Sequence, residues 1–236
     1  MKPKIAAVGL AHPFEVGYDE APALLDATAE SLRRCGADCL NTGVVMHDLE
    51  TVRRAAETLR TLECDVLLIC IATWSEDHHL LDLMSYVEKP VLLRAYPAVD
   101  TGSLCCAHQI GAVFYDVGKT FDFVYGEAED EDCARKTVAL AMPYALAAHM
   151  SHVKMGTIGG RVKGMTEIAY DEFAIKEKLG ARIVNIDEKE MTSKVAAMSD
   201  DEAERLLEEK KALLPPCRIT STHEGMLESI KYYAAL

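Results

Sequence analysis

Three short stretches of the chain are apolar almost without interruption, instead of alternating between apolar and polar positions. They are residues 4–10 (KIAAVGL), 64–72 (CDVLLICIA) and 89–97 (KPVLLRAYP). Continuous apolar runs of this length are typical of parallel β-strands that are covered on both faces. A weaker strand is predicted at residues 37–43 (ADCLNTG). The pattern therefore predicts a parallel sheet with helices on both sides.

Amphipathic helices are predicted between these strands. Residues 20–36 and 47–63 place apolar side chains at positions i, i+3, i+4 and i+7, with charged side chains on the opposite face. Further elements continue the alternation: helices at 75–88 and 101–118, a strand at 121–128 and a long helix from about Glu131 to about His152. Such alternation gives right-handed βαβ units, so residues 1–152 are predicted to form a doubly wound, Rossmann-like α/β domain with a parallel sheet.

The same pattern begins again after residue 152. A strand ends near Gly159, a helix is expected around residues 171–180, and a second strand at 181–187. Charged helices then end before Pro215, because proline lacks the amide that a helix needs, and a final helix follows. Two strands are fewer than a self-sufficient sheet normally has. Residues 153–236 are therefore predicted to be an incomplete, truncated second α/β domain, from a longer protein or from a short form that depends on a partner.

The composition argues against nucleic-acid and membrane partners. With 38 acidic and 25 basic residues the formal net charge is −13, which repels phosphate backbones and anionic membranes. No stretch reaches the roughly 18 apolar residues of a membrane-spanning helix, and no signal sequence is recognisable. The eight cysteines are scattered without a CxxC pair, so neither a disulfide framework nor a common zinc site is indicated. A cytoplasmic location is expected.

The candidate binding residues follow two of the predicted strands. In a doubly wound sheet, ligands lie outside the carboxyl ends of the strands. The substrate-binding candidates at these ends are His12, Glu15, Trp74, Ser75, Glu76 and His78. Trp74 is the only tryptophan of the chain. At a strand end, its indole either packs beneath a loop or offers an apolar face to a sugar ring.

The polar residues after Trp74 also have a structural interpretation. Ser75 can cap the next helix, with Glu76 and Asp77 in the first turn, where carboxylates favour the positive end of the helix dipole. His78 and His79 point about 100° apart on a helix, so they are not expected to bind one metal ion together. The sequence leaves open whether one of the two histidines faces a ligand while the other is solvated.

Two other motifs favour structural roles. Residues 158–165 (IGGRVKGM) contain Arg161 and Lys163 beside glycines but lack the spacing of a nucleotide-binding loop, so tight turning of the backbone explains them better. Residues 100–111 offer Cys105, Cys106 and His108 without a spacing that identifies a nucleophile and its base. Buried thiols are the simpler interpretation, and a cysteine-dependent enzyme is kept as a third functional hypothesis.

Four stretches together carry a resemblance to a known family. In this order, KIAAVGLAHPFEVG, CIATWSEDHHLLDL, DTGSLCCAHQIGA and GTIGGRVKGM resemble the front half of the L-fucose and L-arabinose isomerase superfamily, over nearly the whole chain. The resemblance implies an aldose–ketose isomerase, an intramolecular oxidoreductase of carbohydrate metabolism. It implies a sugar substrate and a homo-oligomer, a trimer or hexamer, in which the first domain of one subunit closes the active site of its neighbour.

The resemblance also implies a divalent cation, Mn²⁺ or another, that holds the sugar oxygens while carboxylates move a proton through an ene-diol. Its ligands are expected outside this chain, so no catalytic or metal-ligating residue is assigned and the chain alone is expected to be inactive. Trp74 falls where the family places a tryptophan in the sugar pocket. The arginine that family members carry after the first strand is absent, so either His12 replaces it or the substrate differs. A non-catalytic carbohydrate-binding or regulatory module is the alternative function.

Overall fold

A computed structural model of the protein describes residues 1–215 and 220–236. The chain divides into two compact units, residues 1–149 and 150–236, which are described separately. The structure confirms the predicted α/β fold class, because the strands of a five-stranded parallel sheet alternate with helices along the sequence.

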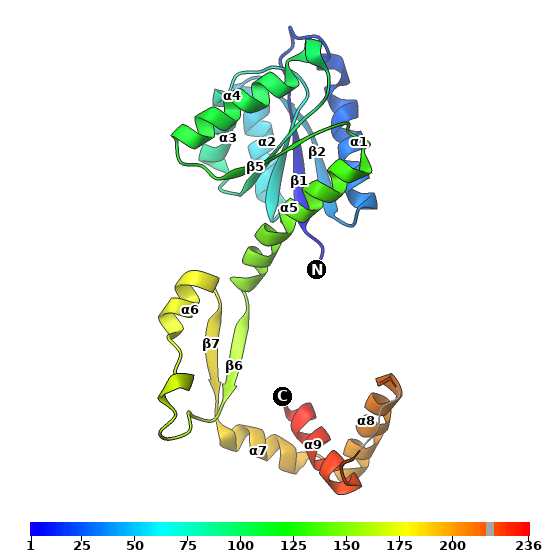
Figure 1. The fold of residues 1–236 in the computed structure, drawn as a ribbon, viewed down its shortest axis with the longest axis vertical. Helices are drawn as coiled ribbons and strands as arrows, with labels where there is room; N and C mark the ends of the chain where they lie inside the picture. Colours follow the sequence, from blue (N-terminus) through cyan, green and yellow to red (C-terminus); the bar gives the residue numbers. More distant parts are fainter. Residues whose placement is uncertain (216–219) are drawn as a thin grey trace. The chain divides into compact units, whose positions relative to one another are not determined.

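The first unit is built around one parallel sheet, which lies among helices (Figure 1). The order of its strands is β2-β1-β3-β4-β5. Its strands are β1 (Lys4–Leu10), β2 (Asp38–Met46), β3 (Val66–Ile71), β4 (Val91–Ala95) and β5 (Phe121–Tyr125). Its helices are α1 (Ala21–Arg34), α2 (Leu49–Thr61), α3 (His78–Tyr86), α4 (Ser103–Asp116) and α5 (Glu131–Met150). Short 3₁₀ helices lie at Tyr18–Glu20 and Val99–Thr101. The order identifies a doubly wound sheet of the flavodoxin-like type.

Two apolar layers explain why the strand sequences are continuously apolar. Side chains of β1 and β3 on one face pack with α2, α3 and α4, and those on the other face pack with α1 and α5. All six residues of β3 are buried. Because each buried aliphatic side chain contributes roughly 1.5–3 kcal/mol, a polar residue in β3 would be costly on either face. This double coverage fixes β1 and β3 as the rigid centre of the unit.

Strand β2 is longer than the predicted weak strand at 37–43. Its pairing with β1 shifts register between Ala7 and Gly9, and beyond that shift β2 continues to Met46. Gly43 adopts a φ of 65° at this irregularity, a conformation that glycine tolerates best. The Thr42 hydroxyl donates to the Ala7 carbonyl over 2.9 Å, a further bond between the two strands next to the shift. The strand therefore ends at Met46, three residues later than the sequence pattern indicated.

The second unit contains a two-stranded parallel sheet and four helices within its described residues. The strands are β6 (Lys154–Ile158) and β7 (Arg182–Ile186), and a 3₁₀ helix lies at Thr166–Ile168. The helices are α6 (Glu172–Leu179), α7 (Glu188–Ala197), α8 (Asp200–Leu213) and α9 (His223–Ala235). Helix α8 ends before Pro215, as predicted, and it packs on α9 through Ala203, Leu207 and Ile230. Across the described ranges of both units, no helix is long and apolar enough to cross a membrane.

Candidate functional site

The candidate site lies at the carboxyl end of the sheet, where β1 and β3 are neighbours. The chain leaves β1 toward β2 on one side and returns to β3 on the other, which makes this the topological switch point of the sheet. Two hydrogen bonds join the segments that follow the strands: Ala72 N–H donates to Leu10 O over 2.9 Å, and His12 N–H donates to the side-chain Oγ1 of Thr73 over 2.8 Å. The segments after β1 and β3 are therefore held side by side.

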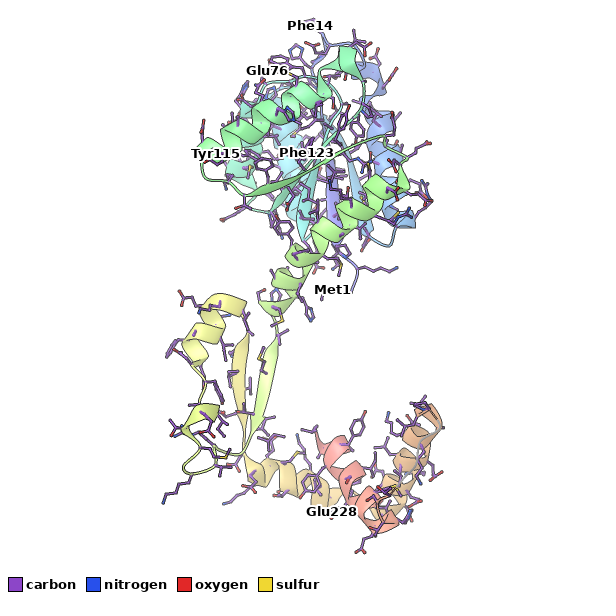
Figure 2. All side chains as sticks on the ribbon, in the orientation of Figure 1. Met1, Phe14, Glu76, Tyr115, Phe123 and Glu228 are labelled. Atoms are coloured by element: carbon purple, nitrogen blue, oxygen red, sulfur yellow. The ribbon has the colours of Figure 1, made fainter. Side chains whose placement is uncertain are left out.

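Glu76 lies between two histidines at this end of the sheet. Its Oε1 is 3.5 Å from His12 Nε2, and its Oε2 is 3.4 Å from His79 Nε2. Figure 2 shows Glu76 and Phe14 at the same end of the first unit. The Phe14 ring is highly exposed and its centroid is 5.4 Å from that of His12. A carboxylate, two imidazoles and an exposed aromatic ring thus lie close together.

The charges of this group are tuned by burial and by each other. Burial would raise the pKa of Glu76, but its own backbone N–H and the nearby His12 and His79 lower that pKa overall. Burial lowers the pKa of His79, and His78 adds to this effect while Glu76 opposes it. Neither ring nitrogen of His79 has a hydrogen-bond partner among the described residues, because its contact with Glu76 lacks hydrogen-bond geometry. The arrangement favours an ionised Glu76 beside a neutral His79.

Trp74 is anchored at the rim of the sheet and is only partly buried. Its indole Nε1–H donates to Gln109 Oε1 over 3.0 Å, and Gln109 Nε2 donates to Asp77 Oδ2 over 2.8 Å. The Trp74 backbone N–H donates to Thr101 O over 2.7 Å. Part of the ring packs on the core, and its centroid is 6.1 Å from the His12 ring. The indole therefore combines core packing with a place beside His12.

Two further predicted residues, Ser75 and His78, differ in burial. Ser75 is fully buried, and its Oγ is 3.4 Å from Glu76 Oε2. The interpretation of Ser75 as a helix cap is wrong, because α3 begins at His78 and Asp77 occupies the capping position without a side-chain bond. His78 is exposed, and it is the buried His79 that faces Glu76.

Glu15 lies in the turn after β1, where its backbone N–H donates to His12 O over 3.0 Å and its carbonyl accepts from Tyr18 N–H over 3.3 Å. Its side chain is partly buried.

The sequence pattern did not indicate Gln109 or a pair of residues next to the site, and it did not decide which of His78 and His79 faces inward. Tyr18 Oη is 3.3 Å from His47 Nδ1, and His47 Nε2 is 3.7 Å from Asp48 Oδ2. His47 directly follows β2. Its place at the carboxyl end of the sheet could therefore be predicted only if the end of that strand was predicted correctly. The signal for Gln109 was weaker, since a glutamine inside an apolar helix is the one hint that its amide faces a polar partner.

The described cysteines include buried, partly buried and exposed thiols. Burial raises the pKa of the Cys106 thiol to about 12, and its Sγ lies 3.4 Å from Ser75 O. Cys105 is exposed and lines a pocket of about 380 Å³ together with Tyr96, His108 and Tyr125. Cys106 is thus a structural thiol, because a protonated and buried sulfur is a poor nucleophile.

The described residues do not fit the divalent cation that the resemblance implies. No group of three or more His, Cys, Asp or Glu side chains within residues 1–215 and 220–236 could hold a metal ion. At the switch point, Glu76 contacts two histidines, and His79 faces it from a buried position.

No family model matches the chain, and no curated protein matches it either.

Proposed function

We propose that the first unit binds a small polyol, such as a sugar, at the carboxyl end of β1 and β3. On this proposal, the chain acts as the N-terminal part of an aldose–ketose isomerase. The observation that carries the binding proposal is the position of Glu76, which lies between His12 and His79 beside a partly exposed indole. The isomerase reaction is supported by the sequence resemblance.

The chemistry of these groups suits a polyol. An ionised carboxylate accepts hydrogen bonds from neighbouring hydroxyls, and an imidazole can donate or accept one. The face of an indole covers the C–H surface of a sugar ring, which combines one apolar contact with the polar ones. Glu76 and His12 would orient two hydroxyls and Trp74 would pack against the carbon skeleton. In an isomerase these groups would position the substrate and exclude water from one side of it.

No step is assigned to a metal ion, because the described residues do not form a site for one. A non-catalytic carbohydrate-binding or regulatory module is a second candidate, and one observation favours it. His12, Trp74 and Glu76 all belong to the first unit, so the proposed contacts need no other unit.

The sole tryptophan makes the binding proposal directly testable. The full chain would be titrated with L-fucose, L-arabinose, other aldoses and ketoses, and polyols while the emission of Trp74 is recorded. Because a carboxylate or imidazole that binds a hydroxyl contributes a charge-assisted or neutral hydrogen bond, Glu76→Gln and His12→Ala should each weaken binding by about tenfold. His149→Ala changes an exposed histidine on α5 and serves as the matched control.

The outcomes separate the candidates. Saturable binding that needs His12 and Glu76, and that an aldose shares with its corresponding ketose, supports the isomerase part, because such a site contacts both substrate and product. Binding that needs the same residues but is confined to one of the two sugars, or to polyols, supports the module. Binding that is equal in the wild type, His12→Ala and Glu76→Gln, or no binding of any sugar, contradicts both.

A further inference from the structure

The second unit has a polar pocket at the carboxyl ends of its two parallel strands. The pocket has a volume of about 490 Å³ and lies between the ends of β6 and β7 and the segment that leads into α6. Its polar lining includes Thr157, Arg161, Tyr170, Glu172 and Asn185. Ligands of parallel α/β units bind at this end of the strands.

Three of these side chains form a directed chain of hydrogen bonds. Tyr170 Oη donates to Thr157 Oγ1 over 3.4 Å, and Thr157 Oγ1 donates to Asn185 Oδ1 over 2.6 Å. The single hydrogen of the Thr157 hydroxyl goes to the amide oxygen of Asn185. Because Thr157 bonds the oxygen of this amide, the amide nitrogen and its two hydrogens are not used in this chain and can serve another acceptor. The chain thus fixes the orientation of the amide and leaves a pair of donors at the pocket.

Arg161 adds a positive charge to the same pocket. It forms no ion pair with any carboxylate of the described residues. The first amides of α6 are already used, because Asp171 accepts from Phe173 N–H and Ala174 N–H over 2.9 and 3.0 Å. The guanidinium is therefore the cationic group that the pocket offers, and it matches a carboxylate or phosphate in shape and charge.

We propose that this pocket binds an anionic polyol, a hydroxylated carbon chain that carries a carboxylate or a phosphate group. The anionic group pairs with Arg161. The Asn185 amide donates to a ligand oxygen, and the Glu172 carboxylate accepts from a ligand hydroxyl. The apolar side of the pocket, formed by Ile168 and Ala169, contacts the carbon chain. This site belongs to the second unit and does not depend on the sugar site proposed at Trp74.

The test measures binding to the full chain by calorimetry with four probes. Glucose 6-phosphate and gluconate carry the two anionic groups, sorbitol is a neutral polyol, and inorganic phosphate is an anion without a polyol. At least one of the two anionic polyols should bind about tenfold more tightly than both sorbitol and phosphate, because only they use both halves of the pocket. Which of the two binds identifies the anionic group.

Paired variants separate a pocket from general charge attraction. Arg161→Gln should weaken binding by about tenfold, since it removes a charge-assisted contact. Lys163→Gln removes the same charge two residues away, at a position that does not line the pocket, and should change affinity less than about twofold. Both side chains are exposed, so both variants should keep the circular dichroism of the wild type.

Four results would each overturn the proposal. They are the absence of binding by either anionic polyol, equal affinity for sorbitol, equal affinity for inorganic phosphate, and equal losses from Arg161→Gln and Lys163→Gln.

Discussion

Gly102 and Gly118 lie at the two ends of α4 and have the same backbone conformation, yet their surroundings differ. Their φ angles are 70° and 71°. A Cβ built at Gly102 would be 2.9 Å from Trp74 Cβ and 3.6 Å from Trp74 N, whereas no described atom lies within 4 Å of a Cβ built at Gly118. The pair therefore separates backbone strain from crowding of the tryptophan.

Gly118→Ala should lower the free energy of unfolding by about 1 kcal/mol, the lower end of the cost of an L-residue in the left-handed region. Gly102→Ala carries the same strain plus the overlap with Trp74. Overpacking of this kind costs roughly 1–3 kcal/mol, so its total should be about 2–4 kcal/mol. Loss of chain entropy in the unfolded state offsets part of each cost equally and cancels in the difference.

Urea denaturation followed by circular dichroism measures both free energies, and the emission of Trp74 reports locally. Gly102→Ala should also shift that emission in the native state, while Gly118→Ala should leave it unchanged. Equal destabilisation by the two variants, within about 0.5 kcal/mol, would show that the Trp74 segment moves aside freely. That result would mean that the bonds of Trp74 to Thr101 and Gln109 do not hold it in place.

Three further predictions concern single groups. Burial lowers the pKa of His79 from its ordinary 6.5, so below that pH the unfolded chain binds a proton more readily than the folded ring does. The free energy of unfolding should therefore fall as the pH falls through this range. His79→Gln should weaken this pH dependence, which urea titrations at several pH values would measure. Asp48 caps α2 by accepting from Thr51 N–H over 2.8 Å, and Asp48→Ala should lower the urea midpoint at neutral pH by an amount equivalent to about 1 kcal/mol, whereas an unchanged midpoint would exclude that capping role. Burial raises the pKa of Cys70 to about 11 and that of Cys106 to about 12, so mass spectrometry should find native alkylation at the exposed Cys105 and modification of the two buried thiols only after denaturation.

The strands of the first unit could be predicted because burial on both faces leaves a strong sequence signal. Residues 66–71 are apolar throughout, and the structure buries every one of them. The end of β2 could not be predicted in this way. The irregularity at Gly43 depends on a hydrogen bond from Thr42 to Ala7, a residue far away in the sequence.

The sequence indicated which strand ends carry the candidate site, but it did not indicate which side chains contact one another there. The rule that ligands lie at carboxyl ends led to His12, Trp74 and Glu76, and the structure brings these three together. The same rule could not tell His78 from His79, because the start of α3 decides which ring turns inward. Ser75 resembled a helix cap in sequence, but the turn before α3 keeps it buried beneath Glu76.

The parallel pairing of β6 and β7 has a consequence for how the second unit forms. Antiparallel strands can pair progressively, starting from a tight turn. The parallel strands β6 and β7 must first bring together residues that are separated by the whole connection from Gly159 to Ala181. The entropy of closing that connection is opposed by a single ladder of two short, partly exposed strands. Amide hydrogens of this ladder should therefore exchange with deuterium sooner than those of β1 and β3, and native-state opening should begin there.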